Sequence, residues 1–98
     1  MTAWYVYLVR AAGGVVYTGI AMDVDRRLGA HASGRGAKYL RGRGPLEIVY
    51  RRKLGARGLA LSVEHRLKRL SKAEKEAIVL AAPTRRSLLR IVGAAQRR

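Results

Sequence analysis

The sequence has no cysteine, no asparagine and only six acidic residues among its 98. The absence of cysteine excludes disulfide bridges, thiolate zinc sites, iron–sulfur clusters and a cysteine nucleophile. Any metal site must therefore be poor in carboxylates. No apolar run approaches the ~20 residues that cross a bilayer, and no basic segment precedes the first apolar residues. We expect a cytoplasmic protein with no signal peptide and no membrane partner.

Positive charge, by contrast, is abundant. The chain carries 21 Lys and Arg residues and a formal net charge of +15. The density is highest from Arg26 to Arg57, where ten basic residues face one carboxylate, Glu47. Because 49% of the residues are hydrophobic, the chain can fold and carry this charge on its surface. Such a surface is typical of nucleic-acid binders. A solvated basic face is the plain alternative, and an anionic membrane surface is a weaker one.

Local patterns predict a small α+β domain with the order β-β-α-β-α-α and a further basic helix. The predicted strands are residues 4–9, 15–19 and 46–52, which form a three-stranded antiparallel sheet flanked by helices. Helices are predicted from Asp23 to about Ser33, around the 3.6-residue spacing of residues 60–70, and from a capping box at residues 71–74. We place a domain over residues 1–82. Residues 83–98, with five arginines and no acid, are expected to form a basic helical extension.

The length of the hairpin loop decides where the tyrosines point. If residues 11–13 form a three-residue loop, Arg10 faces Gly14 and Tyr7 faces Tyr17. Both phenols then project from one face of the sheet, since side-chain direction alternates with a period of two. A loop of two or four residues would put them on opposite faces.

Several motifs follow one another in a fixed order. Residues 5–7 read YVY and residues 17–19 read YTG, followed by Arg27 and, one helical turn later, His31. This order resembles the GIY-YIG nuclease domain, in which a hairpin bears two tyrosines, an arginine follows on the first helix and a glutamate lies on a later helix. The resemblance is strongest over residues 4–31 and extends to about residue 80.

The resemblance implies an endonuclease in which water attacks a phosphodiester in one step, leaving 5′-phosphate and 3′-hydroxyl ends. Tyr7 would be the general base and Tyr17 would position water or phosphate, while His31 shares the proton or binds phosphate. Arg27 suits stabilisation of the transition state, because a guanidinium carries permanent charge in a fork that matches two phosphate oxygens. Tyr5 faces the site if Tyr7 does. A phenol with a pKa near ~10 is a poor base at pH 7, so Arg27 and a metal would have to lower that pKa.

Glu64 is the candidate ligand of a single Mg²⁺ or Mn²⁺ ion. One carboxylate is enough for Mg²⁺ when waters and phosphate oxygens complete its shell, and the resemblance points to the same residue. The other carboxylates have ordinary explanations or no special setting: Asp23 and Asp25 begin a helix, Glu74 belongs to the capping box, and Glu47 and Glu76 stand alone.

The glycine-rich segment from Ser33 to Pro45 is expected to be a flexible cationic loop. Its sequence, SGRGAKYLRGRG over residues 33–44, also looks like the small stand-alone bacterial branch of the family. Glycine permits close backbone approach to phosphates, although a plain surface loop would read the same way. The predicted nucleic-acid contacts are Arg26, Arg35, Lys38, Tyr39, Arg41 and Arg43.

Each candidate also has a purely structural interpretation. Arg27 could pair with Asp23, and Glu64 with Lys68, both at i,i+4 spacing. His31 could be an ordinary histidine at a helix end. The tyrosines could be exposed aromatics of a sheet face, with their hydroxyls in water and no catalytic role.

Three functions compete at this point. The first is a divalent-metal-dependent DNA endonuclease in repair or processing, structure-directed or weakly sequence-specific, with a protein partner for targeting. The second is a catalytically idle module that binds DNA or RNA, and the third is a ribosome-associated protein. DNA is favoured over RNA by the resemblance. The chain lacks the late asparagine that many members of the family carry.

Overall fold

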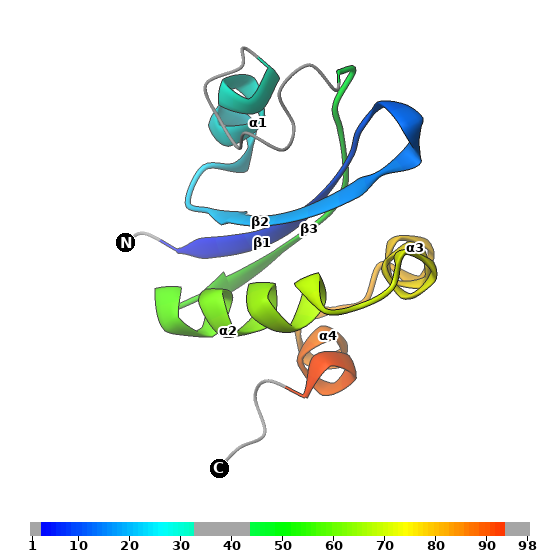
Figure 1. The fold of residues 1–98 in the computed structure, drawn as a ribbon. Helices are drawn as coiled ribbons and strands as arrows, with labels where there is room; N and C mark the ends of the chain where they lie inside the picture. Colours follow the sequence, from blue (N-terminus) through cyan, green and yellow to red (C-terminus); the bar gives the residue numbers. More distant parts are fainter. Residues whose placement is uncertain (1–2, 33–43, 94–98) are drawn as a thin grey trace.

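The computed structural model describes residues 3–32 and 44–93 (Figure 1). Four α-helices and a three-stranded sheet make up this part of the chain, which confirms the predicted α+β class. None of its helices is long and apolar enough to cross a membrane. In chain order the elements are β1 (Trp4–Arg10), the 3₁₀ turn η1 (Ala12–Gly14), β2 (Val16–Ala21), α1 (Val24–Ala32), β3 (Glu47–Gly55), α2 (Arg57–Lys68), α3 (Lys72–Ala81) and α4 (Arg85–Val92).

The sheet has the order β2-β1-β3, with both neighbours antiparallel to the central strand β1. The predicted pairing of the hairpin is wrong in detail, because Arg10 faces Val16 and Tyr7 faces Gly19. Five residues rather than three connect the two strands. Gly13 and Gly14 make this longer turn with positive φ angles of 87° and 85°, which glycine adopts without steric cost.

The conclusion drawn from the three-residue loop nevertheless holds. Tyr17 lies opposite Val9, and Val9 is two positions from Tyr7 on β1. Because side chains alternate along a strand, Tyr7 and Tyr17 project from the same face. Three and five are both odd, so either loop length gives the same result.

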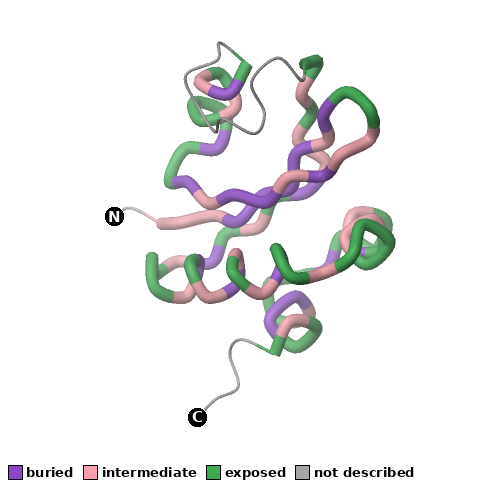
Figure 2. Tube along the Cα trace, viewed as in Figure 1, coloured by how far each residue is buried: buried purple, intermediate pink, exposed green. Residues whose placement is uncertain are grey.

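The helices divide the sheet into two unequal sides (Figure 1). Helix α1 lies over one face, where Tyr7, Val9, Ala21 and Val24 form a small buried cluster. Helices α2 and α4 cover the other face, together with the larger core cluster. Figure 2 shows that the buried segments concentrate on β1, the strand between the two sides. The tyrosine face is therefore the thinly covered one.

Helix α4 is attached to the domain through its own core residues. Leu88 and Leu89 are buried in the main cluster, and the Tyr50 hydroxyl donates a hydrogen bond to the Pro83 carbonyl over 2.7 Å. Thr84 caps the helix, because its side chain accepts a hydrogen bond from the backbone N–H of Ser87. The division at residue 82 remains a prediction about domain organisation, although α4 packs as part of the same body.

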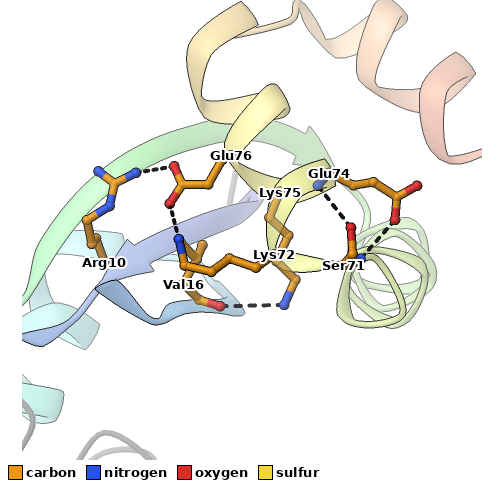
Figure 3. A network of polar contacts seen from close by, with 7 residues as sticks. All are labelled: Arg10, Val16, Ser71, Lys72, Glu74, Lys75 and Glu76. Atoms are coloured by element: carbon orange, nitrogen blue, oxygen red, sulfur yellow. Dashed lines mark hydrogen bonds and ion pairs between the residues drawn. The ribbon is translucent and has the colours of Figure 1, made fainter. Parts of the chain in front are cut away.

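Helix α3 is held against the hairpin by a polar network (Figure 3). The predicted capping box of Ser71 and Glu74 is confirmed. Glu76 pairs with Arg10 of β1 and with Lys72, the second at 3.0 Å. Lys75 of the same helix contacts the Val16 carbonyl, so α3 lies beside β2, which is an edge strand.

Candidate active site

Tyr7 is packed directly on Gly19. The tyrosine is 1% exposed, and Gly19 faces it across the hairpin. A Cβ at position 19 would lie 2.5 Å from Tyr7 Cζ, far inside any real contact distance. Position 19 requires glycine because any larger side chain would overlap the Tyr7 ring, and the backbone there does not have a positive φ angle.

Tyr7 is joined to His31, at the end of α1. The Tyr7 hydroxyl lies 2.9 Å from His31 Nε2 in a buried hydrogen bond. The Tyr17 ring approaches the same imidazole edge-on, with 5.7 Å between ring centroids. His31 is itself only 2% exposed. The three rings that the motif spreads over the sequence therefore form one cluster.

The protonation states in this cluster follow from burial and from Arg27. Burial raises the pKa of the Tyr7 hydroxyl to about 12, although a hydrogen bond from Arg27 acts in the opposite direction. Burial also lowers the pKa of His31, and the charge of Arg27 lowers it further. Near neutral pH the imidazole is uncharged, and in the tautomer with its proton on Nδ1 its Nε2 accepts a hydrogen bond from the Tyr7 hydroxyl. Arg27 alone does not lower the pKa of Tyr7 below its ordinary value, because burial outweighs the guanidinium.

Arg27 is directed to the tyrosine cluster and away from the start of its helix. Within the described residues it makes no ion pair with Asp23. Asp23 instead accepts a hydrogen bond from the backbone of Arg26 over 3.0 Å, and Asp25 pairs with Arg51 over 2.9 Å. Both aspartates are thus engaged at the helix start, as the sequence predicts. The Arg27 side chain is left exposed, beside Tyr7.

Glu64 reaches the same cluster from α2. Its charge contributes to the raised pKa of Tyr7, and its side chain is 18% exposed. The predicted i,i+4 contact with Lys68 is also present, at 3.4 Å. Lys68 in turn lies over the Tyr17 ring, 6.0 Å from its centroid. Glu64 thus acts electrostatically on Tyr7 and also has its ordinary surface partner, Lys68.

The described carboxylates offer one candidate metal ligand near the tyrosines. No group of three or more His, Cys, Asp or Glu side chains that could hold a metal occurs among residues 3–32 and 44–93. Glu64 is the carboxylate placed near the tyrosines, while Asp23 and Asp25 are committed elsewhere. A single carboxylate with waters and substrate oxygens is a normal arrangement for Mg²⁺.

Some predicted site residues are not part of this cluster. Tyr5 shares the sheet face with Tyr7 and is half-buried, but it pairs with Lys53 and lies in electrostatic range of Arg51. Arg26 is exposed on α1. The remaining predicted nucleic-acid contacts lie outside the described residues: Arg35, Lys38, Tyr39, Arg41 and Arg43.

Two lysines beside Tyr17 were missed as functional candidates. Lys68 entered only as a partner of Glu64, and Lys75 not at all. The i,i+4 spacing of residues 64 and 68 indicates that Lys68 lies beside Glu64, and it could have marked Lys68 as a candidate. Nothing in the sequence marks Lys75 as a neighbour of Lys68, because the chain changes direction between α2 and α3.

Known proteins resemble this chain in sequence and in fold. The sequence model of the GIY-YIG catalytic domain matches residues 3–77. A UPF0213 protein of Citrobacter koseri is 52% identical over 79 residues, covering 81% of this chain and 79% of its own length. The UPF0213 protein YhbQ of Salmonella arizonae is 47% identical over 89 residues, covering 91% and 89%. The solution structure of a UPF0213 protein from Bacillus halodurans matches with a TM-score of 0.53 and 43% identity, covering 81% and 84%.

Proposed function

Because this chain belongs to the GIY-YIG domain family, we propose that it is a divalent-metal-dependent endonuclease that hydrolyses phosphodiester bonds in DNA. The observation that carries this proposal is the hydrogen bond between Tyr7 and His31 beside an exposed Arg27. A buried phenol held on a neutral imidazole is a proton relay, and a guanidinium next to it is suited to a phosphate.

Tyr7 and His31 act together in this proposal. The attacking water gives a proton to the Tyr7 oxygen while the Tyr7 hydroxyl proton passes to His31 Nε2. The phenol stays neutral throughout, so its pKa of about 12 is no obstacle. The new P–O bond forms as the bond from phosphorus to the 3′ oxygen breaks. A proton from solvent completes the 3′-hydroxyl, and the phosphate stays on the 5′ side.

Arg27 and Glu64 divide the electrostatic work. The Arg27 fork would bind two oxygens of the phosphate and stabilise the charge that builds up during attack. Glu64 would hold a single Mg²⁺ or Mn²⁺ ion, which supplies Lewis-acid stabilisation of the phosphoryl oxygens when bound. Tyr17, on the other side of His31, would orient the water or the phosphate.

The substrate range is proposed on the same basis. The sequence contains no motif of a known base-reading helix, so we expect structure-directed or weakly sequence-specific cleavage, as in DNA repair or processing. The charge of +15 provides general affinity for the DNA backbone. A protein partner could supply targeting.

A cleavage assay tests the proposal directly. Supercoiled plasmid and branched DNA are incubated with Mg²⁺ or Mn²⁺ and the wild type, Arg27→Ala or Glu64→Gln. Arg69→Ala and Glu47→Gln are matched controls, because each removes the same kind of charge from a surface away from the tyrosines. We expect the two site variants to lose cleavage by ~10²-fold or more, while the controls keep it.

The competing idea of an idle nucleic-acid-binding module makes the opposite forecast. It requires salt-dependent binding with no cleavage across metals and substrates. Cleavage that is equal in the wild type and both site variants would also overturn the proposal, since the activity would then come from a contaminant or another site.

A further inference from the structure

A second basic site lies beside Tyr17, along the outer edge of β2. A surface pocket of about 350 Å³ elsewhere has a mainly apolar lining with one acid, Glu74. The pocket at the β2 edge is lined by basic side chains instead. It has a volume of about 310 Å³ and is lined by Val16, Tyr17, Thr18, Lys68 and Lys75. We call it the edge pocket. Two ammonium groups and a phenol are thus gathered around one hollow.

Lys75 has no acidic partner for its charge. Within the described residues it takes part in no ion pair. Its one hydrogen bond, to the Val16 carbonyl, is long at 3.5 Å. Figure 3 shows the reason, since Glu76 on the same helix faces Arg10 and Lys72. Burial lowers the pKa of Lys75, and the charge of Lys68 lowers it further.

Lys68 connects the edge pocket to the candidate active site. Its ammonium lies 3.4 Å from Glu64 and 6.0 Å from the centre of the Tyr17 ring. Tyr17 lines the pocket on one side and meets His31 on the other. A strand whose reacting phosphate lies at Tyr7 and His31 would therefore pass its next phosphate close to Lys68 and Lys75.

We propose that the edge pocket is a phosphate subsite that binds the backbone phosphate next to the reacting one, with Lys75 as its principal ligand and Lys68 as the second. This inference rests on the proposed function for the position of the reacting phosphate. An anion between two like charges relieves their mutual repulsion, which gives the pocket its selectivity. The phosphate contact fixes the register of the strand and reads no base.

The test uses binding alone, without metal, so that it does not depend on cleavage. The ligands are a thymidine dinucleotide and the same dinucleotide with an extra phosphate at its 5′ or 3′ end. Affinity is measured by NMR titration, following the backbone amides of Tyr17, Thr18 and residue 75. The proteins are the wild type, Lys75→Gln, Lys75→Arg and Lys72→Gln. The last is the matched control, because it removes one lysine of the same helix outside the pocket.

In the wild type we expect the extra phosphate at one of the two ends to tighten binding about tenfold, the value of one charge-assisted hydrogen bond. Lys75→Gln should lose that gain, whereas Lys75→Arg and Lys72→Gln should keep it. Circular dichroism verifies that each variant is folded. If Lys75→Gln fails this check, Lys68→Gln replaces it and must reduce the same gain.

Three results would overturn the subsite. The extra phosphate could add nothing at either end, or Lys72→Gln could weaken binding as much as Lys75→Gln. Inorganic phosphate alone could also bind as tightly as the phosphorylated dinucleotide, which would make the pocket a site for free anions. A failure of the cleavage assay with a positive result here would retain the subsite and reject the nuclease.

Discussion

The Tyr7 hydroxyl and Nε2 of His31 form a buried hydrogen bond across 2.9 Å. The bond joins the central strand of the sheet to the last turn of α1, 24 residues later in the chain. Because both side chains are almost fully buried, bulk water competes little for this hydrogen bond. The protonation of one therefore determines the role of the other.

The acid limb of the pH–rate profile should report His31. Burial and the charge of Arg27 lower the pKa of His31 below its ordinary value of 6.5. The relay requires neutral imidazole, so activity should be full at neutral pH and fall only as the pH drops through a midpoint below 6.5. Cleavage rates measured from about pH 5 to pH 8 test this expectation.

Replacement of Arg27 tests the same electrostatic effect on His31 without a cleavage assay. In Arg27→Gln the charge that disfavours the imidazolium is removed, so the pKa of His31 measured by NMR should rise towards 6.5. A His31 that titrates above 6.5 in the wild type, or that is unmoved in the variant, would contradict the electrostatic account.

Alkaline unfolding should depend on Tyr7. Its pKa is raised to about 12 in the folded chain and is about 10 in the unfolded chain. Between these two pH values the Tyr7 hydroxyl keeps its proton in the folded chain and loses it in the unfolded chain. The free energy of unfolding should therefore decrease as the pH rises from about 10 to about 12. Tyr7→Phe lacks this group, and urea titrations should give it a flatter dependence. Tyr50, whose pKa burial also raises, contributes equally to both proteins. Parallel curves would refute the assignment.

Gly19→Ala should damage the fold and the site together. The added Cβ would overlap the Tyr7 ring, and overpacking of this kind costs about 1–3 kcal/mol. In a Tyr7→Ala background the same substitution should cost far less, because the ring that it meets is gone. Denaturant unfolding of the four proteins completes the cycle. Equal costs in both backgrounds would show that Tyr7 is not the neighbour that requires glycine.

Thr18→Val should stabilise the protein. The Thr18 hydroxyl is buried and, within the described residues, has no hydrogen-bond partner. Valine has nearly the same shape and removes the unpaired group, so we expect a gain of about 1 kcal/mol in the free energy of unfolding. Thr18→Ala is the contrast, since it also removes a methyl group and leaves a cavity. A loss of stability in Thr18→Val would reveal a partner for the hydroxyl.

Much of the site could be predicted from the sequence because its parts are local. The alternation of β1 and β2 fixes the common face of Tyr7 and Tyr17, whichever odd loop length applies. The i,i+4 spacing of Arg27 and His31 puts them on one side of α1. The caps at Ser71 and Thr84 mark the helix starts that the structure has.

The remaining features depend on tertiary geometry. The register of the hairpin follows from a turn made by Gly13 and Gly14, and loop length cannot be read from glycine content. The raised pKa of Tyr7 depends on how deeply α1 buries it, which no spacing reveals. Lys75 reaches the β2 edge only because α3 folds back over the hairpin.

The outer position of β2 has one more consequence. An uncovered edge strand exposes unpaired backbone groups that can recruit the edge strand of a second molecule, the first step toward aggregates. Here Lys68 and Lys75 flank that edge, and β3 at the opposite edge carries Arg51, Arg52 and Lys53. Two such edges repel each other. The same cations that suit a phosphate chain thus disfavour edge-to-edge pairing between copies of the protein, without an extra strand to close the sheet.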